Sequence, residues 1–169
     1  ASVGPLAFEV EDGNRVVAVD LDRDRLEQEL GPETDVLRFS AGDVARTATA
    51  DDAAATAVDA FGGIDGLAHF AAAHSKLNWE SADEEEFNRI MSINVTGPFL
   101  MAKACARVMI DQGTKGAMVL TASGGVLMGG TGENGRGGPA YTTSKGGVLV
   151  LVRTLAKSWG KYGIRVNAI

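Results

Sequence analysis

A strand and the helix that follows it decide the fold of this chain, and their sequences are Ala117-Met118-Val119-Leu120-Thr121 and Tyr141-Thr142-Thr143-Ser144-Lys145. The first run is short and apolar, as expected of a buried strand. The second opens a segment whose apolar residues recur at helical spacing, namely Val148, Leu149, Leu151, Val152, Leu155, Ala156 and Trp159. Tyr141 and Lys145 are therefore four residues apart on one helix face, which places the ammonium beside the phenol.

These residue types are suited to proton transfer. A free tyrosine is a poor base at neutral pH, with a pKa of about 10, and a cation held nearby favours the phenolate form. Ser123 follows the apolar run, so it lies at the carboxyl end of the predicted strand, where open α/β sheets hold their sites. A Tyr-x-x-x-Lys spacing alone would equally describe a helix with an exposed basic residue.

The order of four polar features resembles the short-chain dehydrogenase/reductase family, of the classical type, over essentially the whole chain. Asn94 and Ser123 precede Tyr141 and Lys145, and Gly163-Ile164-Arg165-Val166-Asn167 follows them. The resemblance implies a Rossmann-type fold, hydride transfer to or from a nicotinamide, and a catalytic site of Asn94, Ser123, Tyr141 and Lys145.

Composition limits the class of protein. The chain has 169 residues, 45% of them hydrophobic, enough for one globular domain with a proper core. Its net charge of −6 argues against a nucleic-acid or anionic-membrane partner. No apolar run approaches the roughly 20 residues of a membrane span, and no basic start followed by an apolar middle leads us to expect a signal peptide. Cys105 is the single cysteine, so we expect a reducing, cytoplasmic location.

The rest of the chain alternates predicted strands and helices, which is typical of a parallel sheet. Strands are predicted at residues 15–20, 36–39, 66–70 and within 163–169. Helices are predicted at 1–12 and from a cap at Asp22 to Leu30. An alanine-rich helix is predicted to follow Asp43-Val44 and to end at Phe61, and another runs from a Ser81–Glu84 capping pair to about Ile110. We therefore predict a Rossmann-type doubly wound parallel sheet with helices on both faces, as one domain over 1–169 without linker or repeat.

Both ends of the family's pattern are expected to be missing. The family begins with a strand and a glycine-rich turn that receives the pyrophosphate at a helix N-terminus. Only residues 1–4 could be the tail of that turn, which makes Gly4 a predicted cofactor contact. The family's substrate-binding segment would lie after Ile169. We expect the chain to be incomplete; the alternative is a protein that has lost the glycine-rich turn.

The cofactor prediction is NAD(H). Asp20 ends its strand where an acid can accept hydrogen bonds from the adenosine ribose, although a helix cap or a surface charge is the simpler interpretation. Leu21 follows it instead of an arginine that would receive a 2′-phosphate. Asp43, with Val44 after it, resembles the family acid that faces the adenine, and an ordinary turn aspartate is the alternative.

The family's Asn-Asn-Ala-Gly stands here as His69-Phe70-Ala71-Ala72. Ala71 and Ala72 are predicted cofactor contacts, and the methyl of Ala72 is placed where the backbone should approach the cofactor. His69 is either a replacement donor for the first asparagine or a satisfied core histidine. His69 and His74 together do not suggest a metal site, because no clustered cysteine or acid completes one.

Asn94 has a structural argument of its own. Pro98 lies four residues later and has no N–H to offer, so the Asn94 carbonyl lacks its usual helical partner and a kink is expected. In the family this carbonyl holds a water that links to the active-site lysine. The alternative is a Gly97-Pro98 kink that serves packing only.

A glycine-rich segment separates Ser123 from Tyr141. It contains the spacing Gly130-x-Gly132-x-x-Gly135, which we do not interpret as a dinucleotide fingerprint, because no helix follows directly and Arg153 stands where an acid is required. We expect residues 129–138 to be mobile without ligand and to close over substrate. An idle surface insertion is the alternative.

Two functions remain open on this basis. The first is an NAD-dependent oxidoreductase that interconverts a small secondary alcohol and a ketone, with a 3-oxoacyl-carrier-protein reductase-like enzyme as a narrower possibility. In it Tyr141 exchanges the proton, Ser123 polarises the substrate oxygen, and Lys145 binds the nicotinamide ribose. The second is a non-catalytic dinucleotide-binding or scaffolding homologue. A homo-oligomer, a tetramer or a dimer, is expected by resemblance, helped by Gly146-Gly147.

Overall fold

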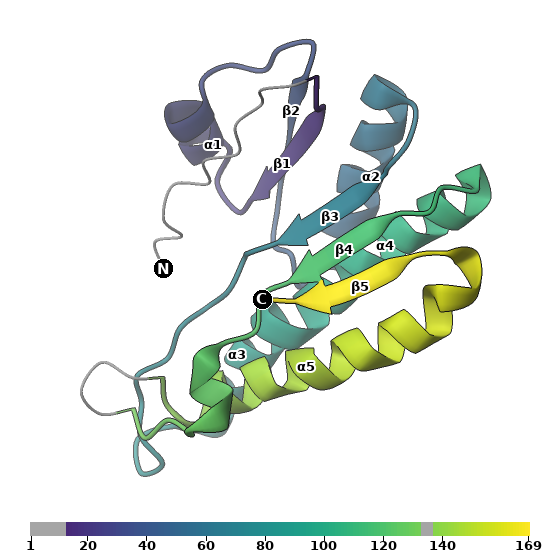
Figure 1. Cartoon of the computed structure of the whole chain (residues 1–169). Coiled ribbons are helices and arrows are strands. Elements are labelled where there is room, and N and C mark those ends of the chain that lie inside the picture. Colours follow the sequence, from purple (N-terminus) through teal and green to yellow (C-terminus); the bar gives the residue numbers. More distant parts are fainter. Residues whose placement is uncertain (1–12, 133–136) are drawn as a thin grey trace.

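The computed structural model describes residues 13–132 and 137–169 (Figure 1). The predicted helix at 1–12 and the predicted contact Gly4 lie outside the described residues. The strands are β1 (Val16–Asp20), β2 (Leu37–Ala41), β3 (Gly66–His69), β4 (Ala117–Leu120) and β5 (Arg165–Ala168). The α-helices are α1 (Arg23–Leu30), α2 (Thr47–Phe61), α3 (Glu84–Met91), α4 (Gly97–Gln112) and α5 (Pro139–Trp159). A π turn at Ser92–Thr96 joins α3 to α4.

The strands form two parallel sheets, which confirms the predicted parallel architecture. β1 pairs with β2, and β4 lies between β3 and β5. Within the described residues β1 and β3 do not pair with each other, and a cleft of about 1190 Å³ lies along them. Because all strands are parallel, their carboxyl ends, with Asp20, His69 and Leu120, meet at one edge of the fold (Figure 1).

Helices cover both faces of the first sheet. Val16 and Ala18 on one face of β1 pack with Leu26 of α1, whereas Val17 and Val19 pack against the main core. This alternation follows from the two-residue period of a strand. In Figure 1, α1 and α2 lie on opposite sides of β1.

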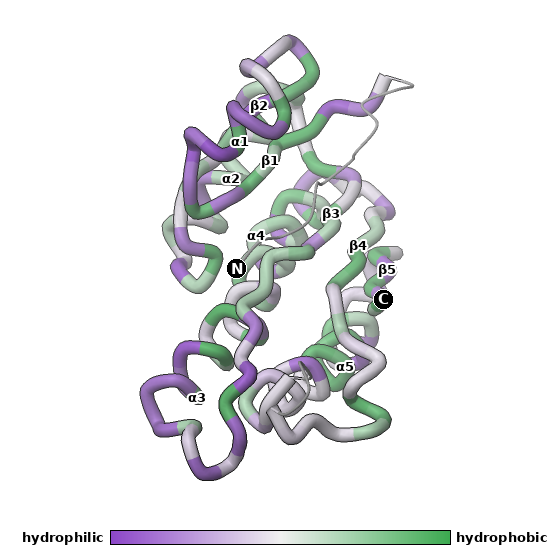
Figure 2. The backbone as a smooth tube through the Cα atoms, turned by 90° about the vertical axis from the view of Figure 1, so that its left-hand side faces the viewer, coloured by the Kyte–Doolittle hydropathy of each residue, from purple (hydrophilic) through white to green (hydrophobic). Residues whose placement is uncertain are grey.

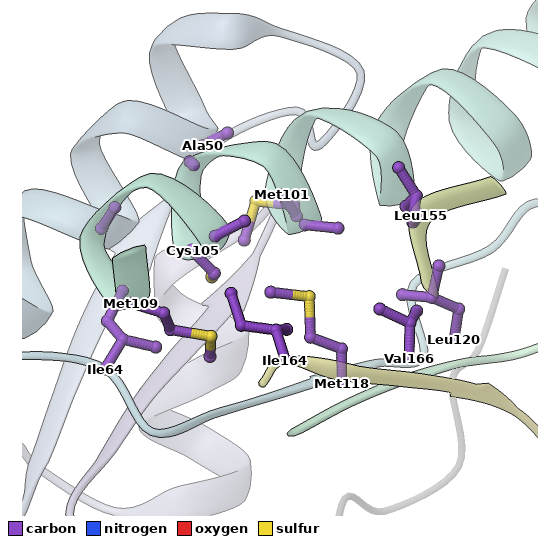
Figure 3. Close-up of a cluster of buried hydrophobic side chains, with 14 of the residues drawn as sticks. Ala50, Ile64, Met101, Cys105, Met109, Met118, Leu120, Leu155, Ile164 and Val166 are labelled. Atoms are coloured by element: carbon purple, nitrogen blue, oxygen red, sulfur yellow. The ribbon is translucent and has the colours of Figure 1, made fainter. Parts of the chain in front are cut away.

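The main core lies between α4, α5 and one face of the second sheet. Met118 and Leu120 of β4 are fully buried and lie close to Val166 of β5 and Met109 of α4 (Figure 3). β4 is mainly hydrophobic along its length, and hydrophilic residues concentrate around α1 and α3 (Figure 2). On the opposite face of this sheet, Ala68 and Asn167 are exposed.

Most predicted boundaries agree with the structure within a few residues, but the predicted capping box is wrong. Asp83, and not Ser81, caps the helix: its Oδ1 accepts from the Glu86 N–H over 2.8 Å. The Ser81 hydroxyl instead donates to Asn78 Oδ1 over 2.8 Å. A carboxylate is as good an N-cap as a hydroxyl, and Ser81 is already used in the preceding turn.

The irregularity expected near Asn94 is present as the π turn. The N–H of Gly97 donates to the carbonyl of Ser92, five residues earlier. Pro98 then stands in the first turn of α4, but the residues before it are also helical, so its missing N–H leaves a gap in the helical hydrogen bonds at this point. π turns of this kind are frequent at functional sites.

Candidate active site

The predicted pair Tyr141 and Lys145 lies on the first turns of α5. Lys145 is 2% exposed, and its Nζ lies 5.8 Å from the centre of the Tyr141 ring. The ammonium donates to the backbone carbonyl of Thr121 over 2.8 Å. Burial lowers the pKa of Lys145 to about 8, because the charged form is costly to remove from water. The structure thus holds a buried cation beside a half-buried phenol, as the spacing predicted.

Ser123 lies three residues after the end of β4, on the edge that carries the strand ends. Its backbone is extended, and its Oγ accepts from the Gly125 N–H over 3.2 Å, which caps the 3₁₀ turn Gly124–Leu127. A capping hydroxyl still has its own hydrogen to donate. Ser123 is therefore held by a local bond that leaves its donor function available.

Asn94 is 1% exposed, and its side chain joins three segments. Oδ1 accepts from the Ala73 N–H over 2.7 Å, and Nδ2 donates to the Ala73 carbonyl over 2.8 Å. Nδ2 also donates to Ser144 Oγ over 2.9 Å, and that hydroxyl donates to the Tyr141 carbonyl over 2.7 Å. The side chain thus ties the π turn and the segment after β3 to the helix turn between Tyr141 and Lys145. Sequence reasoning considered only the Asn94 carbonyl and missed this role of the amide.

His69 lies under the site and is 5% exposed. Burial first, and the charge of Lys145 second, lower the pKa of His69 to about 4. Its Nε2 has no hydrogen-bond partner among the described residues. Its backbone carbonyl accepts from the N–H and the hydroxyl of Thr121, over 3.2 and 2.9 Å. The interpretation as a satisfied core histidine is therefore wrong in one respect, since one ring nitrogen is left unpaired.

The predicted adenosine contacts lie at the ends of β1 and β2. Asp20 Oδ1 accepts from the Asp22 N–H over 3.2 Å, and Oδ2 is 4.0 Å from Arg25. Leu21 is 73% exposed. Asp43 accepts from the Ala45 N–H over 2.9 Å, which is the ordinary turn contact considered above.

The other predicted cofactor contacts differ in how accessible they are. Val44 is buried, and its side chain packs closely on Gly97, whereas Ala71 and Ala72 are half-buried after β3. Asp20 and Ala71 both line the cleft along β1 and β3, together with apolar residues such as Val17, Val19 and Met101. Among the described residues, Tyr141 and Lys145 do not belong to the lining of this cleft. The Asp20 carboxylate at the end of β1 is a hydrogen-bond acceptor of the kind that suits ribose hydroxyls.

The glycine-rich segment packs on another loop where the structure describes it. The N–H of Gly138 donates to the Ser75 carbonyl over 2.8 Å, and a Cβ at Gly138 would overlap the Leu77 carbonyl. A Cβ at Gly137 would overlap the Tyr141 ring. Gly132 has a φ of +83°. Part of the predicted mobile stretch lies outside the described residues, and in the rest glycine permits close approach of two backbones.

The Gly146-Gly147 pair packs within the chain. A Cβ at Gly147 would touch Val95 of the π turn at 3.4 Å, and one at Gly146 would touch Val126 at 3.8 Å. The pair therefore serves the approach of α5 to its own neighbours, which removes it as an argument for subunit contacts.

Two features of the described residues bear on other classes of protein. Residues 13–132 and 137–169 contain no group of three or more His, Cys, Asp or Glu side chains arranged to hold a metal ion. In the same residues no helix combines the length and the apolar character that crossing a bilayer requires.

Comparison with known proteins gives relatives for the whole described region. The family model described as Enoyl-(Acyl carrier protein) reductase matches residues 8–169. Short-chain dehydrogenase reductase 3c of Arabidopsis thaliana is 36% identical over 164 residues, which cover 93% of this chain and 59% of that protein. Levodione reductase of Leifsonia aquatica is 34% identical over 165 residues, which cover 94% of this chain and 59% of that protein. The crystal structure of an NAD⁺-bound xylitol dehydrogenase has a TM-score of 0.79 at 32% identity, over 90% of this chain and 58% of that one.

The parallel sheets, their helices and the site at the strand ends define a Rossmann-type α/β protein. The chain belongs to the short-chain dehydrogenase/reductase family. It spans 59% of the length of the two relatives named above. The family assignment made from Asn94, Ser123, Tyr141 and Lys145 is thereby confirmed, whereas the roles of those residues stay predictions.

Proposed function

We propose that the protein is an NAD(H)-dependent oxidoreductase that interconverts a small secondary alcohol and a ketone. The observation that carries the proposal is the buried ammonium of Lys145 beside Tyr141, in a chain of this family. Relatives named as a levodione reductase and a xylitol dehydrogenase support a carbonyl or carbinol substrate. The NAD⁺ in the latter structure supports the choice of nicotinamide.

Each residue then has a chemical role. Tyr141 gives a proton to the carbonyl oxygen during reduction and takes it back during oxidation. Ser123 donates its free hydroxyl hydrogen to the same oxygen and stabilises the negative charge that develops there. Lys145 favours the phenolate of Tyr141 electrostatically. A bound nicotinamide would supply or accept the hydride.

The cofactor would be held at two places in this chain. Asp20 would accept hydrogen bonds from the adenosine ribose, next to the backbone at Leu21. Asp43, Val44, Ala71 and Ala72 would border the adenine and the adjoining part of the dinucleotide. Lys145 would bind the nicotinamide ribose, and the Asn94 carbonyl would hold a water that connects to Lys145.

Three narrower expectations belong to the same proposal. A 3-oxoacyl-carrier-protein reductase-like activity predicts reduction of a short 3-oxoacyl thioester, which belongs in the substrate panel. The expected homo-oligomer, a tetramer or a dimer, has apolar surface available on α4 and α5, where Phe99 and Val150 are exposed. A cytoplasmic location remains the expectation from cysteine usage.

The proposal is tested with the full-length protein, NAD⁺ and a panel of secondary alcohols, with NADH and the ketones for the reverse direction. Tyr141→Phe removes one oxygen and should lower kcat by roughly 10²- to 10⁴-fold, while NADH still binds. Tyr162→Phe is the matched control, because Tyr162 is 43% exposed and belongs to the turn after α5. Equal turnover in both variants would refute the acid–base role, and retained NADH binding without any turnover in the wild type would favour the non-catalytic alternative.

A further inference from the structure

His74 lies against the ring of Tyr141, a contact that was not predicted from the sequence. The two ring centres are 4.5 Å apart, and the ring planes are inclined by 47°. This is within the range of favourable aromatic contacts. His74 is exposed, whereas Tyr141 is half-buried, so the imidazole covers part of the phenol from the solvent side.

The other neighbours of the Tyr141 ring are already fixed. The backbone of Gly137 lies so close that any side chain there would overlap the ring, and the Lys145 ammonium is 5.8 Å from the ring centre. His74, Gly137 and Lys145 are thus three described neighbours of the Tyr141 ring.

The backbone at His74 is held on both sides. Ala73 has its N–H and its carbonyl bonded to the side chain of Asn94, over 2.7 and 2.8 Å. The carbonyl of Ser75 accepts from the N–H of Gly138, immediately before α5 begins, over 2.8 Å. A surface histidine that contacts an aromatic ring by chance would not need hydrogen bonds that hold its backbone on both sides. The hydrogen bonds at Ala73 and Ser75 connect His74 to elements that also position Tyr141.

We propose that His74 is a positioning residue for the reaction, which holds the phenol of Tyr141 in its productive orientation through contact between the two rings. The inference rests on the proposed acid–base role of Tyr141. The hydroxyl lies at the far end of the ring, so a small tilt of the ring moves the oxygen relative to the substrate. A misplacement of about 1 Å can cost about 10²-fold in rate.

The proposal depends on the ring surface of His74 and not on its nitrogens. His74→Ala removes the ring, whereas His74→Phe keeps an aromatic surface and removes both nitrogens. Lys76→Ala is the matched control, an exposed residue two positions further on in the same loop. All variants are made in the full-length protein and compared for kcat, KM for the alcohol, NADH affinity and Tm.

We expect His74→Ala to lower kcat by at least about tenfold, with NADH affinity and Tm close to wild type. His74→Phe should restore kcat to within about threefold of wild type, and Lys76→Ala should match wild type. Unchanged kcat in His74→Ala would overturn the proposal. So would a His74→Phe variant as slow as His74→Ala, since the nitrogens would then be the essential part.

A second measurement does not depend on turnover. With ring-labelled tyrosine, the protein gives separate NMR signals for Tyr141 and Tyr162, and Tyr141→Phe assigns them. His74→Ala should move the Tyr141 signals and leave those of Tyr162 in place. Unmoved Tyr141 signals would show that the ring contact is absent. If His74→Ala moves the Tyr141 signals but the wild-type protein shows no turnover, the ring contact is present and the proposed function is wrong.

Discussion

The ammonium of Lys145 donates to the backbone carbonyl of Thr121 over 2.8 Å, and Thr121 in turn donates twice to the carbonyl of His69. One residue after β4, Thr121, thus connects helix α5 to the end of β3. Lys145 and His69 are both buried, and burial lowers the pKa of each. The site therefore keeps two groups in surroundings that disfavour their charged forms, as is common where function and stability conflict.

Lys145→Met should abolish activity and stabilise the ligand-free fold. A pKa lowered to about 8 means that the stability contribution of Lys145 is present above its unfolded pKa and is lost as pH falls through 8. At pH 7 the burial penalty is fully present, so removing the amine should raise the free energy of unfolding. In the variant the Thr121 carbonyl loses the hydrogen bond from Lys145, which offsets part of this increase. The free energy of unfolding should therefore rise by about 1 kcal/mol in total.

The measurement is chemical denaturation at pH 7 and at pH 10, with turnover assayed in parallel. Lys157→Met is the control on the same helix, because Lys157 is exposed, and it should change neither quantity. A Lys145→Met variant that is less stable than wild type at pH 7 would contradict the prediction.

His69 should make the fold sensitive to mild acid. Its folded pKa of about 4 lies below the ordinary 6.5, so the unfolded chain binds the extra proton first. Stability should fall as pH drops from about 6.5 towards 4, by roughly 3 kcal/mol in all. His69→Asn removes the titrating group and should flatten this part of the curve. Parallel stability curves for the two proteins between pH 7 and pH 4 would exclude His69 as the cause.

Asp20 should set the preference for NAD(H) over NADP(H). Its carboxylate repels a 2′-phosphate and accepts from free ribose hydroxyls, and Asp20→Ala should narrow the ratio of the two kcat/KM values. Asp24→Ala removes an equal charge from the neighbouring exposed surface of α1 and should leave the ratio alone. A wild type that already prefers NADP(H) would contradict the assignment.

Gly138 should not tolerate a side chain. A Cβ there would overlap the Leu77 carbonyl, so Gly138→Ala must separate the two loops and disturb the start of α5. We expect a loss of about 1–3 kcal/mol in stability and a lower kcat. Gly124→Ala is the control, because nothing lies within 4 Å of its added Cβ. Similar melting temperatures for the two variants would mean that the loops can part at little cost.

The sequence predicted those features that depend on local spacing. Periodicity located the strands, Asp22 was identified as the cap of α1, and the four-residue spacing put Lys145 beside Tyr141. The order of the polar site residues along the chain was enough to identify the family, because these residues occur in a fixed order in its members.

The features that sequence reasoning missed depend on contacts between distant segments. The amide of Asn94 bonds to Ala73 and to Ser144, which are 21 and 50 positions away. The close approach of Gly138 to Leu77 was likewise missed. Asp83 caps α3 in place of the predicted Ser81, whose hydroxyl bonds to Asn78 in the preceding turn.

The π turn at Ser92–Thr96 has a consequence for how this part of the chain can change in length. Such a turn is equivalent to one residue inserted into an α-helix. Deleting one residue there would turn the π turn into ordinary α-helix between Glu84 and Gln112, with only the bond that Pro98 cannot donate missing. Each helical residue advances the side chains by about 100°, so the buried Ile90 and the amide of Asn94 could no longer both face their partners. The more regular helix would be the inactive one, and insertions or deletions in this region should therefore be found outside the turn.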